Sequence, residues 1–235
     1  MIEVIPFAEL GRFDNDWLSA RYHFSFAGYY NPRRLGLGPL RVWNDDTIRP
    51  GGGFPMHGHR DMEIITYVRR GAITHEDHLG SKGRTEAGSV QVMSAGTGIR
   101  HSEFNHEDEP TELFQIWIEP STKDLEPGWA TRPFPREDRA GKLVTLASGR
   151  PGDDPEALPI RQDAAILGAT VAAGEIIAHE FASGRKGYLV AARGRLEVNG
   201  TIVGPRDGCA ITEAGAVTIR ALDTSEIVLV DLPQG

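Results

Sequence analysis

The chain has 235 residues, of which 40% are hydrophobic and 25% charged, so it can bury one large core or two modest ones. Its formal net charge of −8 repels phosphate backbones, and no dense cluster of Lys and Arg opposes it, so we expect no direct binding to nucleic acid. No apolar run approaches the roughly 18 residues of a membrane span, and residues 1–4 resemble no signal peptide. We therefore expect no membrane insertion and a cytoplasmic location.

Short apolar runs recur at intervals of about ten residues and are separated by Gly and Pro. They are rich in β-branched and aromatic residues, which is typical of strands. The clearest runs are residues 63–68, 89–93, 113–118, 187–190, 196–198 and 227–230. Helix is expected only around residues 8–10 and in a connecting region. The pattern predicts an all-β protein with a sandwich or barrel of short strands.

The composition changes between residues 120 and 159, where Pro, Gly, Asp and Glu dominate. Residues 126–128 and 151–155 carry turn signals, whereas 142–146 has the pattern of a strand. We interpret this region as a connection between two domains and predict a boundary near residue 135. The predicted domains are residues 1–135, which bind metal, and residues 136–235, which lack metal ligands.

The two halves of the sequence also resemble each other. A strand ends at Gly71 and another begins after Gly88, and the same order recurs at Gly194 and Gly208. This repetition indicates an internal duplication with two similar barrels facing each other.

Six of the eight histidines lie between residues 57 and 106. His57 and His59 are two residues apart, and on a strand this spacing directs both imidazoles to one face. His101 and Glu103 repeat the spacing with a nitrogen and an oxygen ligand. Three nitrogens and one carboxylate suit a mononuclear first-row metal and leave two positions open in octahedral geometry. Glu63 shares the strand phase of His57 and His59, so spacing alone does not exclude it as the carboxylate ligand.

Residues 54–67 (FPMHGHRDMEIITY) and 94–105 (SAGTGIRHSEFN) resemble the two signature stretches of the pirin family, a branch of the cupins. Ser94 stands where proline is usual. Residues 22–46 and 187–233 resemble the same family, so the similarity covers most of the chain. It implies a bicupin, with two β-sandwich or jelly-roll barrels packed face to face and a few short helices.

The resemblance also implies which side chains bind the metal. The ligands would be His57, His59, His101 and Glu103. Glu63 would then lie behind them, where a carboxylate can orient a ligating imidazole.

The second half has no comparable set of ligands. Aligning Gly194 with Gly71 puts Glu180, Ala182 and Lys186 at the positions of the first-half ligands and Glu63. We therefore expect no second metal ion.

Five further histidines need an assignment. His179 is predicted to be a structural or interface residue. His75, His78 and His106 lie among acidic and turn residues, and we interpret them as exposed loop positions. His23 lies in an alternating apolar strand and is a candidate for lining the metal pocket.

The bacterial pirins that the chain resembles are regarded as quercetin 2,3-dioxygenases, which open the heterocyclic ring of a flavonol with O2 and release carbon monoxide. The 3-hydroxyl and 4-carbonyl of a flavonol can chelate a metal that has open positions. We expect Glu103 to accept the 3-hydroxyl proton as well, because it is the only strongly basic oxygen expected nearby. Iron(II) is the first choice of metal, although Mn, Ni, Co, Cu and Zn accept the same ligands.

Two alternatives stay open. Eukaryotic pirins are similar to the chain in the same motifs and are associated with transcription-factor complexes. This similarity implies, as one alternative, a metal-binding regulatory protein that acts through a protein partner. Alternatively, flavonol cleavage is a side activity, and the true substrate is another enolic or chelating metabolite. The ligand set is shared by unrelated chemistries, so it does not decide between them.

Overall fold

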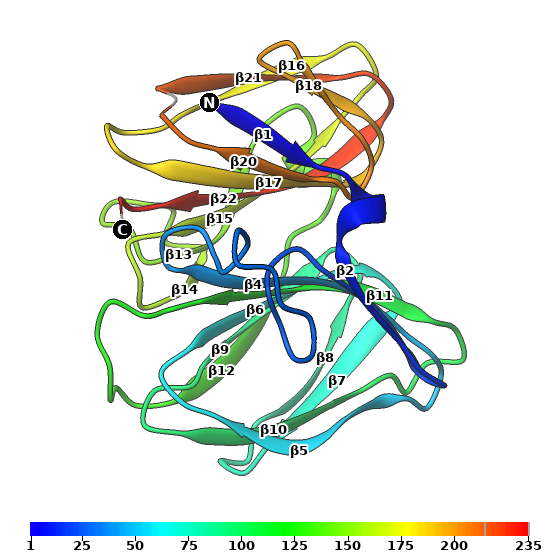
Figure 1. Ribbon diagram of the computed structural model, residues 1–235. Coiled ribbons are helices and arrows are strands. Elements are labelled where there is room, and N and C mark those ends of the chain that lie inside the picture. The colour runs from blue at the N-terminus through cyan, green and yellow to red at the C-terminus, as the bar shows by residue number, and fades with distance from the viewer. Residues whose placement is uncertain (214, 235) are drawn as a thin grey trace.

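The structure is a computed structural model that describes residues 1–213 and 215–234. It contains two β-barrels, one above the other in Figure 1. Each barrel has a seven-stranded and a four-stranded sheet. The predicted all-β bicupin fold is therefore confirmed. The expected helices are two 3-10 turns, η1 (Phe7–Glu9) and η2 (Glu137–Arg139).

The first barrel has a seven-stranded sheet in the order β12-β9-β6-β11-β4-β3-β2 and a four-stranded sheet in the order β5-β10-β7-β8. Its strands are β2 (Gly11–Asp14), β3 (Leu18–Tyr22), β4 (Leu40–Ile48), β5 (Gly53–His59), β6 (Glu63–Arg70), β7 (Ala72–Asp77), β8 (Lys82–Glu86), β9 (Ser89–Ser94), β10 (Ile99–Phe104), β11 (Thr111–Ile118) and β12 (Gly128–Pro133).

The second barrel repeats this arrangement with the orders β1-β20-β17-β22-β15-β13-β14 and β16-β21-β18-β19. Its strands are β1 (Ile2–Ile5), β13 (Val144–Ser148), β14 (Leu158–Pro159), β15 (Ala165–Val171), β16 (Ile176–Glu180), β17 (Lys186–Arg193), β18 (Leu196–Val198), β19 (Thr201–Val203), β20 (Gly208–Ile211), β21 (Ala216–Ala221) and β22 (Ser225–Leu232).

The strand orders support the predicted duplication. Strand β6 occupies the place of β17, and β5 and β10 occupy the places of β16 and β21. Gly71 and Gly194 follow the two equivalent strands with φ of 71° and 80°, a left-handed conformation that favours glycine.

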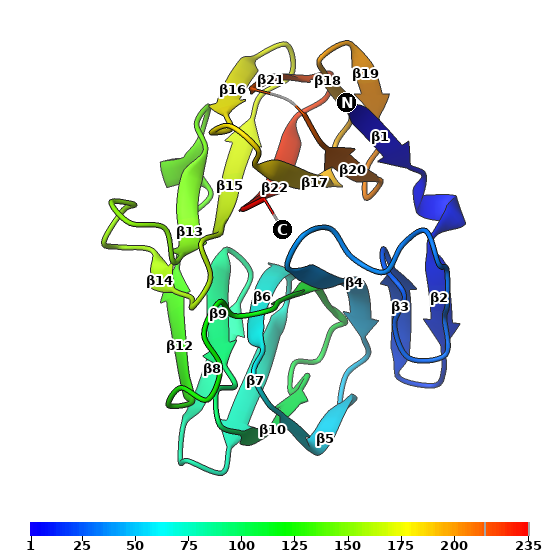
Figure 2. The same ribbon diagram turned by 60° about the vertical axis from the view of Figure 1, so that its left-hand side comes forward.

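The N-terminal strand corrects one detail of the predicted domains. Strand β1 pairs with β20, so residues 2–5 belong to the sheet of the second barrel although we assigned them to the first domain. Figure 1 shows this blue strand among those of the upper barrel. The sequence alone gives no register for so short a strand, because its partner lies about 200 residues away. The chain crosses between the barrels from β12 to β13 (Figure 2), and a boundary near residue 135 stays a prediction.

The largest hydrophobic cluster lies between the two seven-stranded sheets and includes Trp43, Phe114, Tyr188 and Val228. Charged and polar side chains also bridge this interface. Asp45 of β4 pairs with Arg69 and with Arg206 of the second barrel. Both faces of each seven-stranded sheet are therefore covered, one by its own barrel and one by its neighbour.

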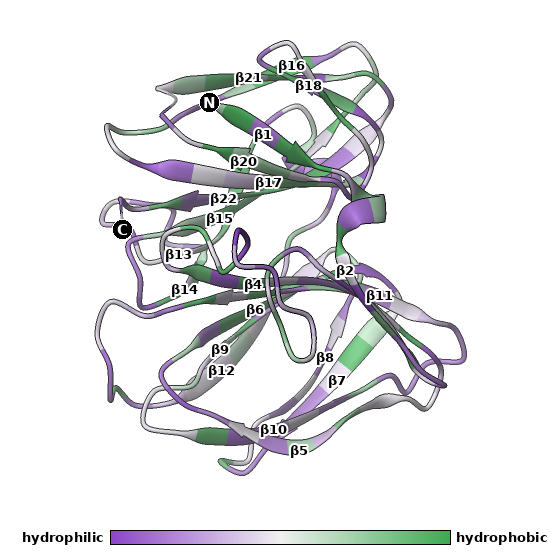
Figure 3. Ribbon diagram, in the orientation of Figure 1, coloured by the Kyte–Doolittle hydropathy of each residue, from purple (hydrophilic) through white to green (hydrophobic). Residues whose placement is uncertain are grey.

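The two barrel interiors differ. Apolar side chains fill the second barrel, among them Ile177, Leu189 and Ile219. The first barrel contains smaller apolar clusters and many buried polar residues. In Figure 3, which colours the ribbon by residue hydropathy, β20 of the second barrel is largely green and β5 of the first barrel is pale. The first barrel thus leaves room for a polar site.

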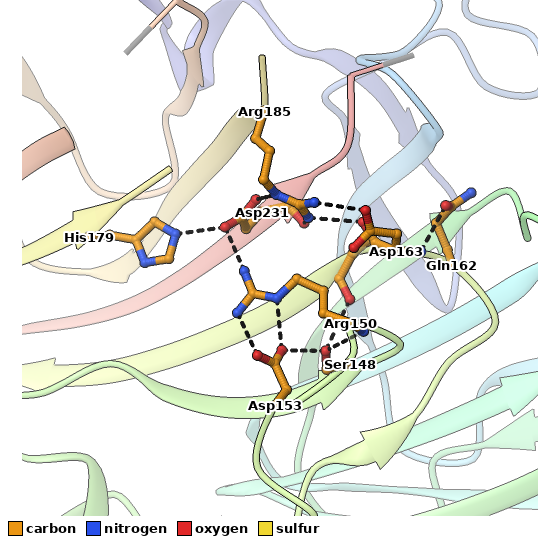
Figure 4. Close-up of polar contacts among 9 residues, drawn as sticks. Ser148, Arg150, Asp153, Gln162, Asp163, His179, Arg185 and Asp231 are labelled. Atoms are coloured by element: carbon orange, nitrogen blue, oxygen red, sulfur yellow. Dashed lines mark hydrogen bonds and ion pairs between the residues drawn. The ribbon is translucent and has the colours of Figure 1, made fainter. Parts of the chain in front are cut away.

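An ion cluster joins four segments of the second barrel (Figure 4). Asp231 at the end of β22 is buried and accepts hydrogen bonds from Arg150, Arg185 and His179. Asp153 in turn binds Arg150. His179 therefore has a structural contact, in line with its interpretation from the sequence.

None of the helices in the described part of the chain has the length and apolar character needed to cross a membrane.

Candidate metal centre

Strand pairing brings the two ligand pairs together inside the first barrel. Strands β5 and β10 are antiparallel, and His57 lies directly opposite His101. His59 is opposite Ile99, which puts it diagonally across from His101. Ligand atoms of His57, His59 and His101 all lie within 4.8 Å of one another. The three imidazoles can therefore bind one metal ion.

A bulge beside His57 helps to orient its ring. The register of β5 and β10 shifts between His101 and Glu103, so that Pro55 and Met56 oppose Ser102 alone. Proline has no N–H for the strand ladder and is tolerated at such a bulge. The Pro55 carbonyl oxygen lies 2.8 Å from His57 Nδ1. Because this oxygen can only accept, Nδ1 carries the proton and the lone pair of Nε2 is free for a metal.

His101 is oriented by a chain of hydrogen bonds from β7. His75 Nε2 lies 3.0 Å from Asp77 Oδ2, so this nitrogen carries the proton and His75 Nδ1 accepts. His101 Nδ1 lies 3.3 Å from His75 Nδ1 and donates to it. His101 Nε2 is then left buried without a hydrogen-bond partner among the described residues. A buried imidazole nitrogen without a hydrogen-bond partner is available to bind a metal ion.

The interpretation of His75 as an exposed loop residue was wrong, since its side chain is fully buried on β7 and stacks on Trp129. Burial alternates along β7, with Ile73, His75 and Asp77 on the inner face, but the polarity of the residues in this strand does not alternate and gave no signal of this burial. His78 and His106 are exposed, as expected.

Glu103 lies in the same cavity but is not in the tight group of three histidines. Its ligand atoms instead lie within 4.8 Å of those of His75 and His101. The carboxylate accepts hydrogen bonds from Gln91 Nε2 and, at 2.7 Å, from Gln115 Nε2. Burial raises the pKa of Glu103 to about 7, although these amide donors lower it. The two groups of possible ligands therefore meet at His101, which belongs to both.

Burial keeps two imidazoles neutral in the metal-free protein. It lowers the pKa of His59 to about 4 and that of His101 to about 3, and the neighbouring His57 lowers both further. Only a neutral imidazole has a lone pair for a metal. The site is therefore ready to bind a cation near neutral pH.

The imidazoles face a cavity of about 220 Å³ whose other walls are mainly apolar and aromatic. A groove of about 700 Å³ adjoins it at the β2–β3 hairpin. The two share four residues: Leu18, Tyr22, Phe26 and Phe54. Pockets for small molecules usually measure about 300–1,000 Å³, so the cavity alone is small and the combined space is ample.

Asp46 lines the same cavity from β4 and was missed at the level of sequence. It is 2% exposed, and burial, followed by the charges of Asp45 and Glu103, raises its pKa well above the usual value. A second carboxyl group besides Glu103 therefore lines the cavity, which we did not expect from the sequence.

Glu63 does not lie behind a ligating imidazole. Its carboxylate accepts a hydrogen bond of 2.6 Å from Ser94 Oγ and one of 3.1 Å from the Arg161 backbone N–H. The chain passes from one sheet to the other between His59 and Glu63, and Asp61 has a φ of 46° at this turn. The turn resets the strand phase, so Ile64 faces the cavity instead.

His23 is not among the residues that line the cavity, which corrects its assignment as a pocket residue. It follows Tyr22, which does face the cavity, so alternation turns His23 to the opposite side of the sheet. There its Nδ1 lies 3.0 Å from Tyr188 Oη of the second barrel.

The second barrel has no equivalent group of three ligands among the described residues. At the equivalent strands β16 and β21, Ile177 pairs with Ile219 and both are buried in the apolar core. Apolar side chains fill the space that the cavity occupies in the first barrel.

Comparisons with known proteins agree with this architecture. The Pirin family model matches residues 6–118, and the quercetinase C-terminal cupin domain model matches residues 145–232. A pirin-like protein of Caulobacter vibrioides is 58% identical over 98% of this chain and 99% of its own length. A quercetin 2,3-dioxygenase of Escherichia coli is 39% identical over 96% of both chains. The crystal structure of the E. coli pirin YhhW with nickel(II) has a TM-score of 0.92, 37% identity and full coverage of both chains.

Proposed function

Because the chain belongs to the pirin family of cupins, we propose that it is a metal-dependent dioxygenase that opens the heterocyclic ring of a flavonol such as quercetin. One O2 is consumed, two carbon–carbon bonds of the ring break, and one ring carbon leaves as carbon monoxide. The proposed ligands of a single divalent transition metal are His57, His59, His101 and Glu103. Iron(II) is our first choice, and the nickel(II) in the E. coli relative supports testing several metals.

The main support comes from the three imidazoles that converge on one cavity. His101 Nε2 is buried without a hydrogen-bond partner among the described residues, and the Pro55 carbonyl oxygen occupies Nδ1 of His57, which leaves Nε2 as its donor to a metal. A bound metal would supply positive charge to hold the 3-hydroxyl and 4-carbonyl oxygens of the flavonol. The protein supplies preformed ligands, because Pro55 and His75 fix two of the rings before the ion arrives.

The shape of the surrounding space supports an extended aromatic substrate. One ring system can occupy the cavity beside the histidines, while another extends into the adjoining groove. The shared wall of Tyr22, Phe26 and Phe54 offers aromatic faces to both parts.

We further propose that Glu103 accepts the 3-hydroxyl proton as the substrate binds. Gln91 and Gln115 hold its carboxylate in the cavity and restrict its orientation. Replacing Glu103 with Gln should lower turnover by about 10²–10⁴-fold, the usual contribution of a general base, with a smaller effect on metal occupancy. Unchanged turnover in this variant would assign the proton to another group.

The function is tested by anaerobic reconstitution of the metal-free protein with Fe(II), Mn(II), Ni(II), Co(II) or Cu(II). Quercetin is then added in air, and its absorbance is followed together with carbon monoxide release. We expect metal-dependent loss of quercetin with one carbon monoxide per flavonol. His57→Ala should abolish it, and His106→Ala, which changes an exposed histidine, should not.

Tight binding of one ion without turnover for any metal would contradict the dioxygenase function. That result would favour either a regulatory protein that acts through a partner or a different chelating substrate.

A further inference from the structure

Three polar side chains lie together on the inner face of the seven-stranded sheet, across the cavity from the histidines. Asn44 and Asp46 alternate along β4, and Gln115 of β11 is directly opposite Asn44. All three line the cavity. The proposed ligands His57 and His101 come from the other sheet of the barrel, so the cavity has a polar group at each of two opposite walls.

Each of these side chains has a buried oxygen that lacks a hydrogen-bond partner among the described residues: Asn44 Oδ1, Asp46 Oδ1 and Gln115 Oε1. All three residues are at least nine-tenths buried. The amide nitrogen of Gln115 is committed to Glu103 at 2.7 Å, which leaves its oxygen for another donor. Buried oxygens without a partner are costly and uncommon, so three in one cavity indicate a ligand that completes them.

The carboxylate on the opposite face of the same strand differs from these three side chains. Asp45 lies between Asn44 and Asp46 and points toward the second barrel, and its two oxygens pair with Arg69 of β6 and Arg206 of the second barrel. Both oxygens of the Asp45 carboxylate are thus paired, whereas Asn44 Oδ1 and Asp46 Oδ1 on the cavity face have no partner among the described residues.

We propose that Asn44, Asp46 and Gln115 form a hydroxyl-binding subsite that accepts hydrogen bonds from a hydroxyl group of the substrate. This inference rests on the proposed function and narrows its substrate class to aromatic chelators with a further hydroxyl away from the metal. Burial and the charges of Asp45 and Glu103 favour a neutral Asp46, which can both donate and accept, as a hydroxyl requires. The acceptor oxygens would disfavour a carboxylate or sulfate at the same place.

The subsite is tested by ligand binding without turnover. Protein loaded with Ni(II) is titrated under argon with quercetin and with 3-hydroxyflavone, which has the same chelating oxygens but no further hydroxyls. Dissociation constants are taken from the absorbance change of the ligand. We expect quercetin to bind more tightly than 3-hydroxyflavone to the native protein.

Asp46→Ala should weaken quercetin binding by about tenfold, the effect of losing one hydrogen bond, and should change 3-hydroxyflavone binding less than about twofold. Asp46→Asn, which keeps hydrogen-bonding atoms, should restore part of the loss. Asp14→Asn removes an exposed carboxylate on β2 outside both cavity and groove and serves as the control. Nickel content is measured for each variant.

Equal weakening of both ligands by Asp46→Ala would overturn the subsite, because it would indicate an effect on the fold or the metal. Unchanged quercetin binding would also overturn it and assign the free oxygens to bound water. A second pair of probes separates this inference from the dioxygenase function. Kojic acid and allomaltol both chelate a metal through a hydroxyl and the adjacent carbonyl oxygen, as a flavonol does. Kojic acid has one further hydroxyl that allomaltol lacks.

If quercetin is neither bound nor cleaved, but Asp46→Ala selectively weakens kojic acid, the subsite stands and the flavonol assignment fails. If the native protein binds quercetin no more tightly than 3-hydroxyflavone, and kojic acid no more tightly than allomaltol, the subsite itself is refuted.

Discussion

His23 should make the protein sensitive to acid through a group that lies far from the metal centre. Its ring is fully buried between the barrels beside Trp43 and Tyr188. Nδ1 binds the Tyr188 hydroxyl, and Nε2 has no partner among the described residues. Burial lowers the pKa of His23 to about 3 from 6.5, with smaller contributions from Arg34, Arg206 and Arg69 and an opposing one from Asp45. A proton on Nε2 would be buried without an acceptor among the described residues.

The sign of the effect follows from proton linkage. Between about pH 3 and 6.5 the unfolded chain binds a proton at His23 and the folded protein does not. The free energy of unfolding is therefore unaffected above about pH 6.5 and falls by roughly 1.4 kcal/mol per pH unit below it. At about pH 4.5, two units below the pKa of His23 in the unfolded chain, this one histidine should lower the free energy of unfolding by about 2.7 kcal/mol.

The perturbation is the double substitution of His23 and Tyr188 by Phe, which removes the titrating ring together with the hydroxyl that would lose its partner. Tyr188→Phe alone keeps His23 and serves as the matched control. The free energy of unfolding is measured with urea at several values between about pH 7.5 and 4.5, on metal-free protein so that metal release does not contribute. His59 and His101 titrate in the same direction in every variant, so they cancel in the comparison.

Between about pH 7.5 and 4.5, we expect the free energy of unfolding to fall by about 2.7 kcal/mol less in the double variant than in the native protein or the Tyr188→Phe control. Parallel curves of stability against pH for all three proteins would refute the assignment, because they would show that His23 accepts a proton in the folded state.

Three further predictions concern the metal centre and the second barrel. His75→Phe should lower metal affinity by about 10–100-fold, because His101 loses its hydrogen-bond acceptor. The affinity is measured in competition with a chelating dye, and an unchanged value would show that His75 does not orient His101. Metal added to the native protein at about 100 times its dissociation constant should raise the free energy of unfolding by about 2.7 kcal/mol in urea titrations. The same increase in the His57→Ala variant would show that the ion binds elsewhere. Asp231→Asn should cost about 3 kcal/mol of stability, since Arg150 and Arg185 lose a buried partner (Figure 4). Its metal affinity should not change, and a loss of affinity would reveal coupling between the barrels.

The sequence by itself determined the features that depend on local periodicity. Alternation over short runs indicated the strands, and the spacing of two residues in His57-x-His59 and His101-x-Glu103 put each pair on one face of a strand. Resemblance to the pirin motifs added the bicupin fold. These inferences hold because a strand fixes the direction of side chains two residues apart, whatever surrounds it.

Only the tertiary structure decided which faces meet. Pairing between strands brings Asp46 to the cavity and His75 to His101. Glu63 does not face the cavity, because the turn at Asp61 resets the strand phase. His23 depends on a second barrel whose Tyr188 lies 165 residues away. Register, bulges and the packing of one sheet on another are set by the whole core, and a one-residue shift in any of them turns a side chain to the opposite face.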